Sequence, residues 1–216
     1  MLKSDDLINK VKSYNKFLNP ETLDKAYNFA VKAHENQKRH SGDPYVIHPV
    51  AVANILTELK LDSATIATGL LHDTIEDTHA TYQTIKDEFG QEVADLVEGV
   101  TKISELENQA TANSRAENFR KLIIATSKDI RVLLVKIADR LHNMRTISSI
   151  DKIEKRERIA KETMEIYSPL ADRMGMNRIR DELEDLSFEV LNPNARKLIK
   201  DRLDKIKENN LISFNA

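Results

Sequence analysis

The chain has 216 residues, of which 40% are hydrophobic and 31% are charged, and its formal net charge is −2. A charge balance this close to neutral gives no general polyanion-binding surface and excludes bulk nucleic-acid binding. The absence of cysteine excludes disulfides and thiolate metal sites, which leaves His, Asp and Glu as metal ligands. The first residues lack a basic segment followed by an apolar one, and no window approaches about 18 apolar residues, so we expect a cytoplasmic protein without a membrane span.

Five glycines and five prolines leave little room for the tight turns of a β protein. Apolar periodicity and end signals instead predict an all-α, compact multi-helix fold of about eleven helices. In the first half, helices are expected from 5 to 17, from 20 to 37, from 48 onward, from 63 into the pair His72-Asp73, and over 81–89 and 91–103. The basic segment 38–44 between the second and third helices is typical of a loop.

In the second half, the polar segment 104–114 is predicted to be the most mobile loop, followed by an amphipathic helix over 115–127. Residues 130–139 are apolar nearly all round, which predicts a central, buried helix. A charged helix over 151–173 should kink or end near Pro169 and stop at Gly175, and further helices are expected over 177–189 and 194–207. We expect one domain over 1–195 and a charged C-terminal helix or linker segment over 196–216.

The first candidate site residues are His72 and Asp73, which follow the apolar run 66–71 directly. Polar groups beside a core must be paired, protonated or bound to a metal. Neighbours on a helix diverge by roughly 100°, so both can reach one ion only at the end of the helix, with other segments completing the site. For the pair by itself, a capped helix end or a salt bridge is the favoured interpretation.

Asp139 is the second candidate, because it ends the most apolar predicted helix, where an unpaired carboxylate is costly. One outlet is an ion pair with Lys136, Arg140 or Arg145, and the other is a divalent cation. His142, Asn143 and Thr146 lie at helical offsets from Asp139 that share one face. This polar stripe on a buried helix is the arrangement expected where a core helix reaches a cleft.

His48 is the third candidate, at a helix entrance beside Pro49, although a polar N-terminal residue bonded to backbone would look the same. Two histidines and two aspartates would form a mixed nitrogen and oxygen set of ligands, which suits Mn²⁺, Zn²⁺ or Fe²⁺ better than Ca²⁺. Four protein ligands would leave room for water or a substrate oxygen, as in a catalytic site.

The order His48, His72-Asp73, Asp139 resembles the H…HD…D pattern of HD-domain metal-dependent phosphohydrolases. More closely, the chain resembles the hydrolase domain of RelA/SpoT homologues, which make and degrade the alarmones ppGpp and pppGpp. The resemblance covers roughly residues 20 to 195 and is carried mainly by RHSGDPY (39–45), IHP (47–49), LHDTIEDT (71–78), GVTK (99–102) and KIADRLHNMRT (136–146).

The resemblance implies that His48, His72, Asp73 and Asp139 hold one Mn²⁺. It implies that Glu76 and Asp77 activate or orient the attacking water. It further places a set of residues along the wall of the nucleotide site: Arg39, His40, Ser41, Asn143 and Thr146. Many relatives carry lysine or arginine at the position of His40.

The chemistry of hydrolysing a 3′-pyrophosphate agrees with these residue types. The reaction needs a Lewis acid and a positioned base, and a carboxylate near the metal can be that base. Cations for the spectator phosphates could come from Lys38, Arg39 or Arg145, whereas we interpret Lys136 and Arg140 as partners of surface acids.

The sequence therefore predicts a Mn²⁺-dependent (p)ppGpp 3′-pyrophosphohydrolase with a guanine-nucleotide substrate. An HD hydrolase acting on another nucleotide and a non-catalytic regulatory domain are the alternatives. The intact pair Glu76-Asp77 argues against the regulatory alternative. Long family members continue into a synthetase domain, and because the chain ends at Ala216 we expect no synthetase activity. The preference between ppGpp and pppGpp, the oligomeric state and a closing role for 104–114 stay open.

Overall fold

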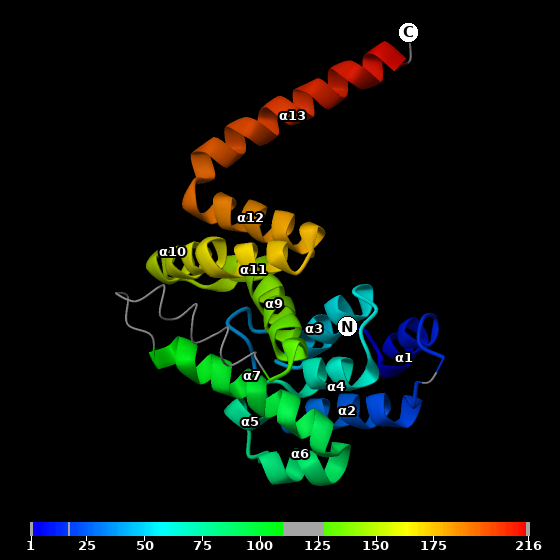
Figure 1. The fold of residues 1–216 in the computed structure, drawn as a ribbon. Helices are drawn as coiled ribbons and strands as arrows, with labels where there is room; N and C mark the ends of the chain where they lie inside the picture. Colours follow the sequence, from blue (N-terminus) through cyan, green and yellow to red (C-terminus); the bar gives the residue numbers. More distant parts are fainter. Residues whose placement is uncertain (1, 17, 110–127, 215–216) are drawn as a thin grey trace. The chain divides into compact units, whose positions relative to one another are not determined.

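The computed structural model describes residues 2–16, 18–109 and 128–214, and they confirm the predicted all-α fold (Figure 1). Among these residues there is no strand, only an isolated bridge between Lys38 and Pro44. They form two compact units, Met1–Asn143 and Met144–Ala216, each taken by itself below. The predicted boundary at residue 195 concerns the extent of the hydrolase domain and stays a prediction.

The first unit contains α1 (Ser4–Lys12), α2 (Pro20–Ala33), α3 (Ile47–Glu58), α4 (Ser63–Leu71), α5 (Thr74–Asp77), α6 (Tyr82–Phe89), α7 (Gln91–Gln109) and most of α9 (Ile130–Arg145). The starts of several helices follow from their caps. Asn19 accepts from the backbone N–H of Glu21 before Pro20, and the side chain of Asp62 accepts from Thr65 at the start of α4.

Helix α4 is the centre of the first unit, because it contacts α2, α3 and α7 (Figure 1). Its residues from Thr65 to Leu71 are all buried. A glycine allows the close approach to α3: a β-carbon on Gly69 would lie 2.6 Å from Leu56 Cδ1 and 3.3 Å from Ala53 Cα. The end of α4 is thereby held against the middle and the C-terminal part of α3, the helix whose first turn contains His48.

Several predicted boundaries in the first unit are wrong. The first two helices end at Lys12 and Ala33, and not at 17 and 37. Residues 104–109 are not a loop but the last part of α7. This segment contains no helix breaker, and Ser104 and Glu107 bind side chains of α9, so it needs no apolar stripe to stay helical. Helix α9 continues past 139 to Arg145, so Asp139 lies inside it. The predicted helix over 115–127 and the rest of the predicted loop lie outside the described residues.

The second unit contains a 3₁₀ turn η1 (Ile147–Ser149), α10 (Ile153–Glu162), a π-helical segment η2 (Thr163–Tyr167), α11 (Ser168–Arg173), α12 (Asn177–Leu191) and α13 (Pro193–Phe214). The π-helical segment directly precedes Pro169, whose ring cannot accept the regular α-helical carbonyl arrangement. The predicted kink is therefore found just before the proline. Gly175, with a φ of +71°, ends the helix as predicted.

No helix among the described residues combines the length and the apolar character needed to cross a membrane.

Candidate metal centre

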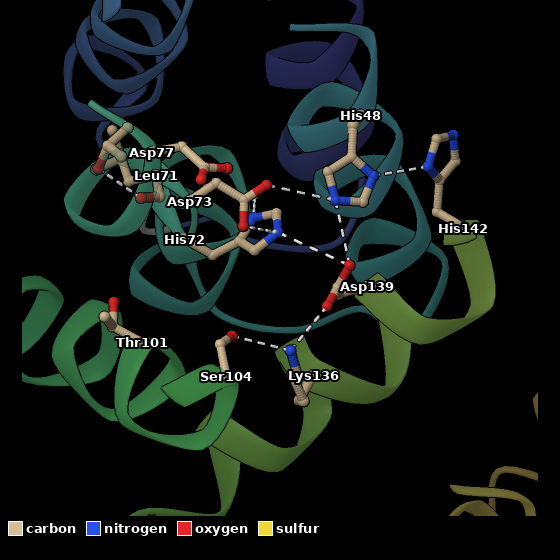
Figure 2. A network of polar contacts seen from close by, with 12 residues as sticks. His48, Leu71, His72, Asp73, Asp77, Thr101, Ser104, Lys136, Asp139 and His142 are labelled. Atoms are coloured by element: carbon tan, nitrogen blue, oxygen red, sulfur yellow. Dashed lines mark hydrogen bonds and ion pairs between the residues drawn. The ribbon is translucent and has the colours of Figure 1, made fainter. Parts of the chain in front are cut away.

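Four candidate ligands from three separate segments lie close together in the first unit (Figure 2). His48 lies in the first turn of α3, His72 follows the last residue of α4, Asp73 precedes α5, and Asp139 lies on α9. His48 Nε2 is 3.1 Å from Asp139 Oδ1, and His72 Nε2 is 3.0 Å from Asp73 Oδ1. One atom each of His48, His72 and Asp139 lies within 4.8 Å of the others, close enough to share one ion.

The backbone of α4 fixes the tautomer of His72. Its Nδ1 lies 2.9 Å from the carbonyl oxygen of Gly69, so Nδ1 carries the hydrogen of the neutral ring, and Nε2 is the nitrogen that takes up either a proton or a metal at the cluster. This Nε2 is buried and has no hydrogen-bond partner among the described residues. A buried nitrogen that faces two carboxylates without a hydrogen bond fits a metal ligand.

A second histidine orients His48. The Nδ1 atoms of His48 and His142 are 2.7 Å apart, so one ring donates to the other and His48 Nε2 is turned toward Asp139 (Figure 2). Burial lowers the pKa of His48, and this outweighs the carboxylates that raise it. A neutral imidazole is the form that binds a metal.

A proton and a metal ion would compete for Nε2 of His72. Burial alone would lower the pKa of His72, but the carboxylates of Asp73 and Asp139 raise it to about 9. Burial would likewise raise the pKa of Asp73, yet His72 holds it below its ordinary value. A divalent cation would compensate the same carboxylates that favour the proton, so the donor set fits such an ion.

Asp139 uses one of the two outlets that the sequence left open, the ion pair with Lys136, and turns its other oxygen toward the histidine cluster. Its Oδ2 accepts from Lys136 Nζ at 3.1 Å, while its Oδ1 faces His48. Lys136 is 5% exposed and also contacts Ser104 Oγ and Glu107 Oε2, both at 3.0 Å (Figure 2). The interpretation of Lys136 as a partner of surface acids is therefore wrong. Burial opposes ionisation of Asp139, but Lys136 holds its pKa well below the ordinary value.

Arg140 corrects the same interpretation. It is 8% exposed and its Nη2 lies 3.2 Å from Glu107 Oε1, so it too is a buried cation and not a partner of a surface acid. The C-terminal part of α7 brings Glu107 to both cations because the helix extends beyond residue 103.

The acidic pair Glu76-Asp77 lies on α5, directly after the ligand Asp73. Burial, together with Asp73 and Asp77, raises the pKa of Glu76, against the opposing effects of Lys136 and a hydrogen bond from Ser104. Asp77 Oδ2 accepts from the hydroxyl of Tyr45 at 2.7 Å. Glu76 is therefore a stronger base than an ordinary glutamate, as a proton acceptor requires.

Two of the predicted nucleotide-site residues are connected to the cluster. Arg39 Nη2 donates to Asn143 Oδ1 at 2.9 Å, and Asn143 Nδ2 donates to Asp139 Oδ1 at 2.6 Å. His40 and Ser41 are exposed, and Ser41 donates to Asp43 within the same loop. Thr146 precedes the turn η1 in the second unit, so its predicted role stays a prediction.

Sequence reasoning assigned no role to Tyr45, and it placed His142 on the stripe without recognising its contact with His48. The available signal for Tyr45 is its place in the motif RHSGDPY, three residues before His48. A groove of about 1140 Å³ lined by residues of α1, α2 and 78–88 includes none of the predicted site residues, so cavity size would not have found the cluster.

The described fold and ligand geometry agree with the comparison with known families. Residues 26–177 match the HD domain, which is more than half of the chain. The chain therefore belongs to the HD domain family, whose hydrolases bind a divalent metal.

Within that family, the predicted resemblance to RelA/SpoT proteins is confirmed. The chain is 52% identical over 210 residues, 97% of its length, to GTP pyrophosphokinase rsh of Brucella melitensis. It is 56% identical over 179 residues, 83% of its length, to the bifunctional (p)ppGpp synthase/hydrolase SpoT of Escherichia coli and to the guanosine-3′,5′-bis(diphosphate) 3′-pyrophosphohydrolase of Shigella flexneri. The aligned part is 28% of the first relative and 25% of the other two, so the chain spans about a quarter of their length.

The fold also matches a solved structure, that of a metazoan ortholog of SpoT described as hydrolysing ppGpp. The TM-score is 0.57 at 24% identity, and the match covers 80% of this chain and 94% of the other. At this identity the match supports the fold alone.

Proposed function

We propose that this chain is a Mn²⁺-dependent 3′-pyrophosphohydrolase of the alarmones ppGpp and pppGpp. The observation that carries the proposal is the cluster of His48, His72, Asp73 and Asp139 beside an intact Glu76-Asp77 pair. Support for the substrate comes from the relatives, two of which are named for synthesis or hydrolysis of this guanosine nucleotide. Manganese is proposed because two imidazoles and two carboxylates are an ordinary donor set for it.

In this reaction, water attacks the phosphorus next to the 3′ oxygen, the bond between them breaks, and GDP or GTP and pyrophosphate are released. A divalent cation, when bound, supplies Lewis acidity toward water and the phosphoryl oxygens. Glu76 receives the proton of the attacking water, because its pKa is raised, and Asp77 orients that water.

The chain's own residues hold the nucleotide in this proposal. Arg39 is half-buried and one nitrogen of its guanidinium, Nη1, has no hydrogen-bond partner among the described residues. A buried guanidinium nitrogen of this kind is a donor ready for an acceptor on the substrate. His40, Ser41 and Asn143 complete the proposed nucleotide site within the first unit, and the role of Thr146 stays a prediction. Lys136 and Arg140 are not assigned to substrate phosphates, since they bind Asp139 and Glu107.

The test is release of pyrophosphate from ppGpp with Mn²⁺ by the wild type and by Asp73→Ala. We expect release by the wild type and a loss of at least about a hundredfold in the variant, because even indirect partners of metal ligands are worth 10–100-fold. Asp87→Ala is the matched control, since Asp87 is exposed on α6 and binds Gln83. No release by the wild type, or equal release by Asp73→Ala, would refute the proposal.

A further inference from the structure

The hydroxyl of Tyr45 connects two carboxylates that have different tasks in the proposed function. Its oxygen lies 2.8 Å from Oδ2 of Asp73, a metal ligand, and 2.7 Å from Oδ2 of Asp77, which orients the water. Tyr45 thus lies within hydrogen-bond distance of both Asp73 of the metal cluster and Asp77 of the acidic pair. It lies in the segment between α2 and α3, outside both elements that it connects.

The residues at the end of α2 hold the Tyr45 ring and backbone in place. The ring stacks on His34 with the two centroids 4.7 Å apart and an angle of 24° between the planes. The backbone N–H of Tyr45 donates to the carbonyl oxygen of Gln37 at 3.0 Å. His34 is 1% exposed, so the ring rests on a buried surface. These contacts fix both the position and the tilt of the Tyr45 ring independently of any hydrogen bond that its hydroxyl makes.

The same end of α2 holds the backbone of Asp77. The side-chain amide of Gln37 donates to the carbonyl oxygen of Asp77 at 2.6 Å. With its nitrogen used in this way, the Gln37 Oε1 accepts from Nδ1 of His34 at 2.7 Å. Gln37 therefore holds the backbone of Asp77 with its side chain and the backbone of Tyr45 with its carbonyl. His34, Gln37 and Tyr45 thus form one connected group in the segment that follows α2.

Hydrogen-bond counting indicates which carboxylate depends more on the hydroxyl. A phenol has one hydrogen and donates to one carboxylate at a time. Asp73 is partly buried, and its oxygens lie 3.0 Å from His72 Nε2 and 3.5 Å from His48 Nε2, so a shared cation would hold it as well, whereas the side chain of Asp77 is exposed. An exposed carboxylate without a fixed donor samples several rotamers. Asp77 therefore loses more than Asp73 when the hydroxyl is removed.

On the basis of the proposed function, we propose that Tyr45 is a positioning residue that fixes the carboxylate of Asp77 relative to the metal ligand Asp73, with His34 and Gln37 holding Tyr45 in place. Tyr45 needs no contact with the nucleotide or the metal in this role. It acts on the rate of the chemical step through the geometry of Asp77, because a small misplacement of an orienting group costs up to about 10²-fold in rate.

The test uses Tyr45→Phe in the full 216-residue chain, which keeps the stacked ring and removes only the hydroxyl. We expect kcat for ppGpp with saturating Mn²⁺ to fall about 10–100-fold while KM changes less than twofold. The Mn²⁺ affinity, measured by electron paramagnetic resonance of free Mn²⁺, should stay within about threefold, because in this proposal the single hydrogen of the hydroxyl serves Asp77 and not the ligand Asp73. A loss of 10–100-fold, the usual effect of removing a hydrogen-bond partner of a metal ligand, would assign the hydroxyl to Asp73 instead. Tyr14→Phe is the matched control, since it removes a hydroxyl that binds the carbonyl of Leu61 at 3.0 Å, and its kcat should not change.

A second comparison separates positioning of Asp77 from a general structural effect. In an Asp77→Ala background there is no carboxylate to hold, so adding Tyr45→Phe should change the residual rate less than twofold. A further tenfold loss there, or an unchanged kcat in the single variant, overturns the inference. So does a kcat loss that follows a matching loss of Mn²⁺ affinity. A wild type that releases no pyrophosphate instead refutes the proposed function itself.

Discussion

Replacing Lys136 with methionine tests whether the metal ligand Asp139 depends on a built-in cation. The Lys136 ammonium is buried and lies about equally close to Asp139, Glu107 and Ser104, at 3.1, 3.0 and 3.0 Å. Removing one partner of a buried ion pair typically costs 3–5 kcal/mol, because the other charge is left uncompensated. Since the Glu107 side chain is 20% exposed and can be hydrated, we expect about 3 kcal/mol, at the lower end of that range.

The measurement is urea unfolding of metal-free protein, where this loss corresponds to a shift of about 1–2 M in the midpoint. Saturating Mn²⁺ should reduce the difference between wild type and Lys136→Met, because the bound cation compensates Asp139 in place of the ammonium. Lys102→Met is the control: Lys102 pairs with Glu98 on the exposed face of α7 and should matter little. A midpoint shift no larger than that of the control would refute the reasoning.

Further predictions concern His72. Because the carboxylates raise its pKa to about 9, Mn²⁺ must displace a proton at neutral pH, so the Mn²⁺ affinity should rise up to about tenfold per pH unit between pH 6 and 8. Calorimetry in buffers of different ionisation enthalpy should count about one proton released, and an affinity independent of pH would contradict this reasoning. The stability of the metal-free protein should depend on pH in the opposite direction from the Mn²⁺ affinity. The raised pKa of His72 stabilises the folded state below about pH 6.5, and this contribution is lost as the pH rises toward 9. Gly69→Ala should lower the free energy of unfolding in urea by about 1–3 kcal/mol, because the added β-carbon would lie 2.6 Å from Leu56 Cδ1. It should also weaken Mn²⁺ binding by displacing the carbonyl that holds His72. Unchanged Mn²⁺ affinity would show that α4 and α3 can separate without moving the ligand.

The metal ligands could be predicted from the sequence because each has a local signal. His48 stands before a proline at a helix start, His72-Asp73 follow a fully apolar run, and Asp139 interrupts an apolar helix. Each signal has an ordinary structural explanation by itself. Their order along the chain, together with the longer motifs, is what favoured one shared site. The structure brings all four together, although the ion that they would hold remains part of the proposal.

The polar contacts around the ligands could not be predicted in the same way. Helical periodicity reports apolar faces, so the end of α7 looked like a loop because Ser104 and Glu107 interrupt any apolar stripe. These two residues are helical and polar because they face Lys136 across the gap to α9. A contact between residues about 30 positions apart does not affect the apolar periodicity of either helix. Tyr45 was hidden for the same reason, since its partners Asp73 and Asp77 lie on another element.

The buried cations change the charge that the site presents to a substrate. Lys136 and Arg140 are matched by Asp139 and Glu107, which leaves Asp73 as the one ligand carboxylate without a protein cation of its own. A divalent cation bound at the cluster would exceed the charge of Asp73 by one unit. The ionised carboxylates of Glu76 and Asp77 beside it add two negative charges and Arg39 adds one positive charge, so the loaded site is close to neutral, like the whole chain with its formal net charge of −2. We therefore expect the phosphates to be held by direct contact with the bound cation and with Arg39, and not by a long-range positive field.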